Sequence, residues 1–261
     1  MAAGSGGATA STLVVRQTGP VRVAVLSDIH ANVTALDAVL ADIGSVDAIW
    51  HLGDVVGYGP EPDAVVARLS NVGATGVAGN HDRAAVGGPE IEWFNPDARA
   101  AMEWTRTHID PTTAAWLRDQ PERRTQGDAL LVHGSPRDPV WEYITSASVV
   151  RANIPEMPTT IGLYGHTHVP MAWAERDGQI EGAEPRPGAT VSLDGASHLL
   201  VNPGSVGQPR DGDPRASWME LDLAAATATW HRVPYDIPAV QRAMRDAGLP
   251  ARLAERLRHG L

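Results

Sequence analysis

Short apolar runs alternate with amphipathic helical patterns in the first third of the chain, and a polar motif directly follows each run. The runs cover residues 21–26, 48–52 and 75–78, and apolar residues recur at helical spacing over 32–44 and 63–69. This alternation predicts βαβ units in a parallel sheet. Because the carboxyl ends of parallel strands meet at one edge of a sheet, the side chains that follow these strands are expected to lie together in a crevice.

Strand and helix patterns continue through the rest of the chain. Residues 96–119 read as helical with a break at Pro111 and are expected outside the sheet, whereas 129–132 and 160–164 read as strands with a helix at 146–154 between them. Four later runs are predicted to form a second, largely antiparallel sheet: 169–174, 198–201, 217–221 and 227–233. The pattern as a whole indicates an α/β protein.

The 261 residues fall within the range of one α/β domain, and we expect a single domain over residues 20–261. Residues 1–19 are rich in Gly, Ala, Ser and Thr and lack a basic segment followed by an apolar one, so we expect a flexible extension there. No stretch of the sequence approaches the roughly 18 apolar residues of a transmembrane helix. A cytoplasmic location is the resulting expectation.

The composition excludes several kinds of catalysis. The chain has no cysteine and no lysine, which rules out disulfides, zinc-thiolate sites, a cysteine nucleophile, Schiff-base chemistry and a P-loop lysine. Its net charge of -10 opposes nonspecific attraction to nucleic acid or to an anionic membrane. We therefore expect neither a membrane nor a stable nucleic-acid partner.

Side chains with metal-binding chemistry follow five of the predicted strands. They are Asp28, His30, Asp54, Asn80, His133, His166 and His168. A two-metal site needs hard or borderline ligands and a bridging carboxylate, and this set contains both. Any one fragment is weak evidence, since a lone histidine such as His133 is more often a hydrogen-bonded core residue. Five motifs at five strand ends make coincidence a poor explanation.

The spacing suggests how two ions would be shared. Asp28 and His30 lie two residues apart at the mouth of a strand and can bracket one ion. Asp54 can give one carboxylate oxygen to each of two ions held about 3.5–4 Å apart. Asn80 can offer its amide oxygen to the second ion.

The order of the motifs, D-x-H, G-D-x-x-G, G-N-H-D, H-G and G-H-T-H, resembles that of the calcineurin-like metallophosphoesterase family, and the resemblance covers residues 21 to about 210. It implies a two-sheet β-sandwich flanked by helices on both faces, a four-layer α/β/β/α fold. It also implies two ligand sets, the first made of Asp28, His30, Asp54 and His168 and the second of Asp54, Asn80, His133 and His166.

The same resemblance implies hydrolysis of phosphate esters with two divalent ions, and manganese, iron, zinc or nickel would suit the mixed ligands. Two cations lower the pKa of a bridging water from about 15.7 toward about 7, so that hydroxide can attack phosphorus in line. His81 would be the general acid for the leaving group, the alternative being a loop histidine that only orders Asp82. Asp82 would either orient His81 or form a structural hydrogen bond to the loop backbone.

Two segments separate the chain from better-known branches of this family. Protein phosphatases and symmetrical dinucleoside tetraphosphatases usually have G-D-x-V-D-R-G and G-N-H-E, whereas this chain has G-D-V-V-G-Y-G at 53–59 and G-N-H-D at 79–82. The arginine that would clamp phosphate is absent there. Arg210 is the candidate replacement, with an exposed surface arginine as the equal alternative.

The N-P-G-S segment at 202–205 resembles that of small bacterial and archaeal phosphodiesterases. It could turn backbone N–H groups toward the site or form a tight connecting turn.

Aromatic residues and an arginine-rich tail are further candidates. Trp141 and Tyr143 could stack on a nucleobase or aryl leaving group, although such residues more often cover core. Trp93 and Phe94 have the same two interpretations, and the loop before them could form a flap. The tail at 237–261 interleaves five arginines with apolar residues, which favours a helix with a packed apolar face over a site for an acidic partner or nucleic acid.

We therefore expect a dinuclear-metal phosphoesterase that acts on phosphodiesters or small nucleotide-like esters. A serine/threonine protein phosphatase and a dinucleoside polyphosphate hydrolase are alternatives that keep the same chemistry. A non-catalytic interaction module of the same fold would be expected to lack ligands, and none is missing from this sequence.

Overall fold

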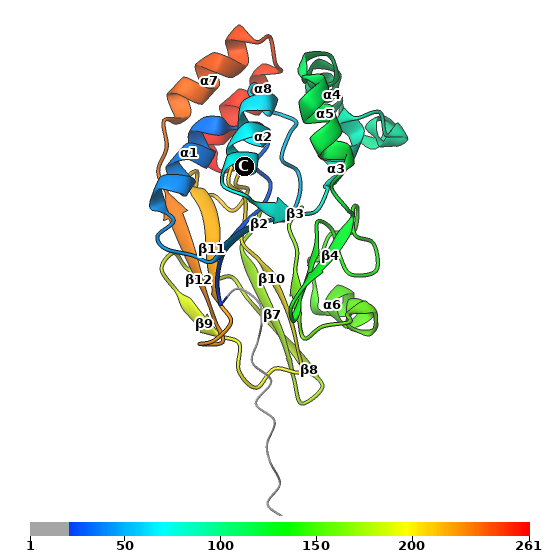
Figure 1. The fold of residues 1–261 in the computed structure, drawn as a ribbon, viewed down its shortest axis with the longest axis vertical. Helices are drawn as coiled ribbons and strands as arrows, with labels where there is room; N and C mark the ends of the chain where they lie inside the picture. Colours follow the sequence, from blue (N-terminus) through cyan, green and yellow to red (C-terminus); the bar gives the residue numbers. More distant parts are fainter. Residues whose placement is uncertain (1–20) are drawn as a thin grey trace, which may run out of the picture.

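The computed structural model describes residues 21–261, and the predicted flexible extension at 1–19 lies outside them. Within the described residues the strands form two six-stranded sheets (Figure 1). The first sheet has the order β3 (Thr75–Gly76), β2 (Ala48–His51), β1 (Arg22–Leu26), β11 (Ala216–Asp222), β12 (Thr227–Val233) and β9 (Thr190–Ser192). The second has the order β4 (Arg123–Gln126), β5 (Ala129–Val132), β6 (Ile161–Leu163), β10 (His198–Asn202), β7 (Met171–Arg176) and β8 (Gln179–Ala183).

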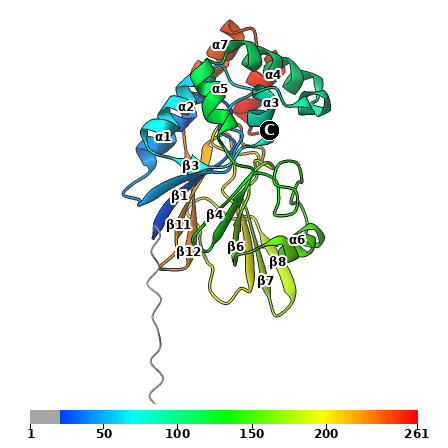
Figure 2. The same cartoon turned by 45° about the vertical axis from the view of Figure 1, so that its right-hand side comes forward.

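Helices cover the outer face of each sheet, as Figure 2 shows from a second direction. The core outside the first sheet is shared with α1 (Val33–Asp42), α2 (Pro62–Asn71), α3 (Asn80–Ala85), η1 (Pro89–Trp93), α4 (Pro96–His108), α5 (Pro111–Arg118), α7 (Ile237–Asp246), α8 (Ala251–Arg256) and η3 (Leu257–His259). The core outside the second sheet is shared with α6 (Ala147–Asn153) and η2 (Ile154–Glu156). The predicted four-layer α/β/β/α sandwich is therefore confirmed.

Strand β1 shows how the sequence produces these layers. Val23 and Val25 point into the core between the two sheets, whereas Ala24 and Leu26 point toward the helices. Side chains alternate between the faces of a strand, so a strand covered on both faces reads as one continuous apolar run. The helix that follows begins as predicted, because the Asn32 side chain accepts a hydrogen bond from the Ala35 N–H at 3.0 Å.

The four later runs do not form one sheet, which corrects the prediction. β11 and β12 join the first sheet, where β11 pairs antiparallel with β1, and β7 and β10 join the second, where β10 pairs parallel with β6. The polar strands β4, β8 and β9 were not predicted. Apolar periodicity identifies strands, but strands pair through main-chain groups that every residue carries, so the pattern says little about partners.

The fold brings the carboxyl ends of five strands to one end of the sandwich. β1, β2 and β3 are mutually parallel in the first sheet, and β5 and β6 are parallel in the second. The loops that follow these strands carry the candidate metal ligands. Within residues 21–261, no helix has the length and apolar character needed to cross a membrane.

Candidate metal centre

The residues that follow the strands adopt a backbone conformation that L-residues rarely take. The angle φ is positive at Asp28 (52°), His30 (51°), Asp54 (50°), His166 (66°) and His168 (61°). Left-handed residues other than glycine cost of order 1–3 kcal/mol each and persist where the surrounding structure holds them, often at functional sites. Five such residues in loops that meet at one end of the sandwich therefore point to a site with a function.

The first donor set contains Asp28, His30, Asp54 and His168, and one donor atom of each lies within 4.8 Å of the others. His168 Nε2 lies 3.2 Å from Asp28 Oδ1 and 3.2 Å from His30 Nε2. His30 Nε2 lies 3.7 Å from Asp54 Oδ2. All four side chains are buried. These are the residues that the resemblance implied for the first metal.

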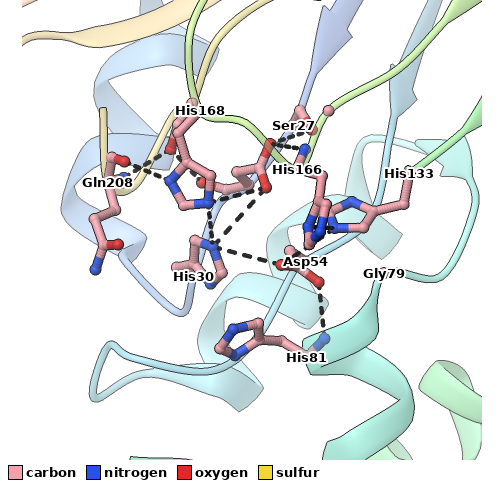
Figure 3. A network of polar contacts seen from close by, with 12 residues as sticks. Ser27, His30, Asp54, Gly79, His81, His133, His166, His168 and Gln208 are labelled. Carbon is pink, nitrogen blue, oxygen red and sulfur yellow. Dashed lines mark hydrogen bonds and ion pairs between the residues drawn. The ribbon is translucent and has the colours of Figure 1, made fainter. Parts of the chain in front are cut away.

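The second donor set contains Asp54, His133 and His166, with the same close spacing. His133 Nε2 lies 3.3 Å from Asp54 Oδ2 and 3.0 Å from His166 Nδ1. Asn80 joins this set, since its Oδ1 lies 3.1 Å from His133 Nε2. Figure 3 shows Asp54 between the pair His30 and His168 and the pair His133 and His166. All seven predicted ligands are thus brought together.

Three of the histidines have their Nδ1 atoms anchored to main-chain oxygens. His30 contacts Val56 O at 3.2 Å, His133 contacts Leu52 O at 2.8 Å and His168 contacts Gln208 O at 2.6 Å. A carbonyl oxygen can only accept, so each Nδ1 carries a proton, and in the neutral ring each Nε2 keeps a lone pair. This tautomer is the one that binds a metal through Nε2, and all three Nε2 atoms point into the donor sets.

The unpaired donor atoms suit cations. His30 and His168 direct two Nε2 lone pairs at each other across 3.2 Å, an arrangement that a cation or a proton must relieve. In the described part of the chain, Asp28 Oδ1 is buried without a hydrogen-bond partner. Burial opposes charge on His133, but the charge of Asp54 and its hydrogen bond raise the pKa of His133 to about 9, so this carboxylate attracts positive charge. Each donor set could therefore hold a divalent metal ion.

Asp54 is shared by the two sets through one oxygen. Oδ2 faces His30 at 3.7 Å and His133 at 3.3 Å, whereas Oδ1 accepts a hydrogen bond from the His81 N–H at 2.9 Å. The prediction that each oxygen would serve a different ion stays a prediction, and in this structure it is Oδ2 that faces both donor sets. The first amides of a helix have no partner within the helix, and α3 begins at Asn80, so the His81 amide is available to hold Oδ1.

His81 lies beside the donor sets without belonging to either. Its ring centroid lies 4.4 Å from that of Tyr58, 4.6 Å from Phe94 and 4.9 Å from His30. Burial is the main cause that lowers the pKa of His81 to about 4. The ring is therefore positioned by packing against other rings.

Asp82 does not orient His81, which corrects one of the two predicted roles. Its Oδ1 accepts hydrogen bonds from the N–H groups of Val55 (2.8 Å) and Val56 (3.1 Å), and its Oδ2 accepts one from Gly79 (3.0 Å). The buried carboxylate thus ties the loop after β2 to the start of α3. The structural alternative is the one that holds, because these unpaired loop amides are the strongest donors within its reach.

A cleft of about 120 Å³ opens beside Asp54 and His166 and is also lined by Trp141, Tyr143 and Arg210. The Tyr143 ring stacks on His166, with the centroids 3.9 Å apart and the planes at 23°, and the Tyr143 residue is 49% exposed. The Trp141 ring stands edge-on to His166 at 6.5 Å. The three predicted substrate contacts therefore share one cleft with the metal ligands.

Arg210 is not a free surface arginine. It is half-buried in the cleft, its Nη2 donates to Gln208 Oε1 at 2.8 Å, and its guanidinium carbon lies 5.9 Å from the Tyr58 ring centroid. Its Nε is buried and has no hydrogen-bond partner among residues 21–261. These contacts favour the phosphate-clamp interpretation of Arg210 over the exposed one.

Comparison with known sequences decides the family. A profile of the calcineurin-like phosphoesterase superfamily domain matches residues 21–225. The chain belongs to this superfamily. An uncharacterized protein of Methanocaldococcus jannaschii is 34% identical over 248 residues, which cover 90% of this chain and 96% of that protein.

Solved structures agree with the assignment to the calcineurin-like phosphoesterases. A metallophosphoesterase from Sphaerobacter thermophilus is 42% identical and aligns with a TM-score of 0.85 over 93% of this chain and 100% of its own. A hypothetical protein from Pyrococcus horikoshii, 22% identical, has a TM-score of 0.75 over 92% of this chain and 98% of its own, which shows the fold alone. The family is metal-dependent and acts on phosphate esters, which matches the chemistry of the two donor sets.

The N-P-G-S segment braces the site from behind. The Gly204 N–H donates to Asn202 Oδ1 at 2.8 Å, and the Ser205 hydroxyl donates to the Asp28 carbonyl at 2.7 Å. The Asn202 amide also donates to the Gly165 carbonyl at 2.8 Å. For Gly204 the tight-turn interpretation is therefore correct, and the segment joins the loop that holds Asp28 to the loop that holds the last two histidines.

Sequence reasoning missed three residues that shape this centre. Tyr58 packs against His81, the Ser27 hydroxyl donates to Asp28 Oδ2 at 2.6 Å, and Gln208 accepts from His168 through its main-chain oxygen. Tyr58 had a detectable signal, since it stands in the segment where the chain departs from the protein phosphatases. The other two act through hydrogen bonds that spacing does not reveal.

Gly79 is required by the close approach of two loops, and Gly79→Ala is expected to damage the centre. A Cβ at this position would lie 2.1 Å from Asp54 Oδ1 and 2.5 Å from Asp54 N. We expect a loss of about 1–3 kcal/mol in the free energy of unfolding, measured by denaturant titration, together with weaker metal binding. Gly44→Ala is the control, because nothing lies within 4 Å of a Cβ there. Equal stability and metal content in the Gly79 variant would show that the loops are not in this contact.

Proposed function

We propose that this chain hydrolyses phosphate esters, either phosphodiesters or small nucleotide-like esters, with two divalent ions that share Asp54. The observation that carries the proposal is the meeting of two donor sets on one carboxylate, beside a cleft that His81 and Arg210 also line. Manganese, iron, zinc or nickel would suit the mixed nitrogen and oxygen ligands.

The chain's residues divide the work of the reaction. When bound, two divalent ions supply an acidic water as nucleophile and positive charge for the phosphate oxygens. Arg210 would contact the phosphate group through two N–H donors of its planar guanidinium. His81 would give a proton to the oxygen of the leaving group. Asp82 holds the loop on which His81 stands.

His81 must be protonated to act as an acid. Burial lowers the pKa of its ring to about 4, whereas the negative charge of a phosphate ester in the cleft would favour the protonated form. Its Nδ1 is buried and has no hydrogen-bond partner within residues 21–261, so no carboxylate holds the ring in one tautomer. We infer that the substrate itself provides the charge that keeps the proton on His81.

The shape of the cleft supports small substrates. A volume of about 120 Å³ admits a phosphate group with a small or planar substituent more readily than a loop of a folded protein. Trp141 and Tyr143 offer aromatic faces to such a substituent, and Trp93, 70% exposed at the rim, offers another. A serine/threonine protein phosphatase and a dinucleoside polyphosphate hydrolase are the alternatives that the same centre would serve.

A substrate panel tests the proposal. The protein is stripped of metal, restored with Mn²⁺ and assayed with bis-p-nitrophenyl phosphate, p-nitrophenyl phosphate, a dinucleoside polyphosphate and a phosphopeptide. We expect hydrolysis of the small esters at higher kcat/KM than of the phosphopeptide. Preference for the phosphopeptide would overturn this ranking, and no hydrolysis of any ester would favour a non-catalytic interaction module.

The clamp role of Arg210 gives a separate prediction. Arg210→Gln is expected to lower kcat/KM for bis-p-nitrophenyl phosphate by about 10–100-fold, because one charge-assisted contact to phosphate is lost. Arg210→Lys should recover only part of this loss, since an ammonium group lacks the planar fork. The control is Arg118→Gln, because Arg118 is exposed on α5. Metal content is measured in parallel for each variant. Wild-type kinetics in Arg210→Gln would rule out the clamp.

A further inference from the structure

A second groove lies next to the metal cleft. It has a volume of about 630 Å³ and lies between the start of α4 and the C-terminal helices, and we call it the outer groove. Its lining residues are Asn95, Pro96, Asp97, Arg252, Leu253, Arg256 and Leu261. Asn95 also lines the metal cleft. The outer groove and the cleft are therefore neighbours that meet at this residue.

Two arginines of the tail face the outer groove. Arg252 and Arg256 stand four residues apart on α8, which places them on one side of the helix. Arg252 is exposed and Arg256 is half-buried. Burial, then the charges of Arg210 and Arg252, lower the pKa of Arg256 to about 10. Arg256 therefore feels the charge of one arginine from the cleft and one from the groove.

Several other arginines of the chain are held by carboxylates. Arg68, Arg137, Arg215, Arg232 and Arg258 each form an ion pair with a carboxylate. Among the side chains that the structure describes, by contrast, no Asp or Glu forms an ion pair with Arg210, Arg252 or Arg256. What sets these three apart is their position, because they gather around the outer groove and the adjoining cleft, where they form a positive region that can receive negative charge.

Two groups in the outer groove oppose this charge in part. Asp97 lines the groove, and its charge raises the pKa of Arg256, but this effect is smaller than the opposite effect of Arg210 and Arg252. Arg256 Nε also donates to an oxygen of Leu261, which is the last residue of this sequence and carries its terminal carboxylate. Within the described part of the chain, the guanidinium of Arg252 forms no hydrogen bond or ion pair, and the remaining N–H groups of Arg256 are available as well. Together with Arg210 of the adjoining cleft, the arginines outnumber these two acidic groups.

We propose that the outer groove binds a further phosphate group of the substrate while the ester to be cleaved lies at the metal centre. The row from Arg210 through Arg256 to Arg252 would follow a chain of phosphates, since guanidinium groups bind phosphate oxygens in pairs. The preferred substrates would then be phosphate esters or anhydrides that carry at least one additional phosphate. This inference rests on the proposed function, because it assigns the second part of the same substrate.

Competition with inorganic phosphates tests the outer groove. Phosphate and tripolyphosphate are compared as inhibitors of bis-p-nitrophenyl phosphate hydrolysis by the Mn²⁺-loaded protein, with free Mn²⁺ held constant. We expect tripolyphosphate to inhibit the wild type competitively and about tenfold or more tightly than phosphate. In Arg252→Gln/Arg256→Gln the ratio of the two inhibition constants should fall by about tenfold. Arg245→Gln, exposed on α7 and outside the groove, should keep the wild-type ratio.

Two results would overturn the inference. One is an unchanged ratio in the double variant, and the other is tripolyphosphate inhibition that is non-competitive, which would make the groove a separate regulatory anion site. The single variant Arg252→Gln is made as well, because this exposed side chain can be replaced without disturbing the fold. The ratio of the two inhibition constants is expected to fall by about threefold in it. If the wild type hydrolyses no ester, the proposed function fails, and calorimetric binding of tripolyphosphate to the same variants still tests the groove.

Discussion

Asp54→Asn is expected to remove both metal ions and to lower kcat/KM for bis-p-nitrophenyl phosphate by at least about 10³-fold, since each ion contributes several kcal/mol to stabilising the transition state. Oδ2 of Asp54 faces both donor sets, so the substitution removes a negative charge from both sets. The amide of asparagine can still offer an oxygen, but it carries no charge to hold two cations close together. Among the described residues, Asp54 alone belongs to both sets.

The metal content of the purified variant, measured by mass spectrometry, is the deciding quantity for Asp54→Asn. The matched control is Asp177→Asn, because Asp177 also has a left-handed backbone (φ 50°) and is exposed in the turn between β7 and β8. That control should keep the wild-type metal content and rate. Two ions per chain in the Asp54 variant would show that the carboxylate does not bridge them.

His81→Ala is expected to keep its metal and to lose about 10²–10⁴-fold in kcat toward esters with poor leaving groups, the usual contribution of a general acid. The ring lines the cleft and belongs to neither donor set, so its removal should spare the ligands. The main-chain N–H that holds Asp54 is still present in alanine. Esters of p-nitrophenol need little protonation and should lose much less.

A comparison of leaving groups gives the test of His81. Rates are plotted against the pKa of the leaving alcohol for the wild type and for His81→Ala, with His108→Ala, exposed on α4, as the control. An acid role predicts a steeper dependence in the His81 variant. An equal loss for every leaving group would instead mean that His81 positions the site, and a fully retained rate would exclude both roles.

The sequence was sufficient to find the candidate ligands because their positions depend on strand ends. Asp28, Asp54 and His133 each follow a short apolar strand, and parallel strands bring such residues together in any sandwich of this topology. The pairing of β11 with β1 could not be read in the same way, since main-chain pairing leaves no mark in the side chains.

The finer chemistry depends on hydrogen bonds that no motif encodes. Asp82 looked like a partner of His81 by adjacency, yet three loop amides occupy its carboxylate. Arg210 and Arg256 are distant in sequence, yet they are close enough in space that the charge of Arg210 lowers the pKa of Arg256. The packed tail helix was predicted from its periodicity, whereas the direction of its arginines depends on where α8 docks, which only the structure gives.

Titration of the metal-free protein with Mn²⁺, while hydrolysis of bis-p-nitrophenyl phosphate is followed, tests the central claim most directly. Two ions that share Asp54 predict no hydrolysis without metal and a rate that reaches its plateau at about two equivalents of Mn²⁺ per chain. A rate that persists in EDTA, or a plateau at one equivalent, would contradict a dinuclear centre made of these seven side chains.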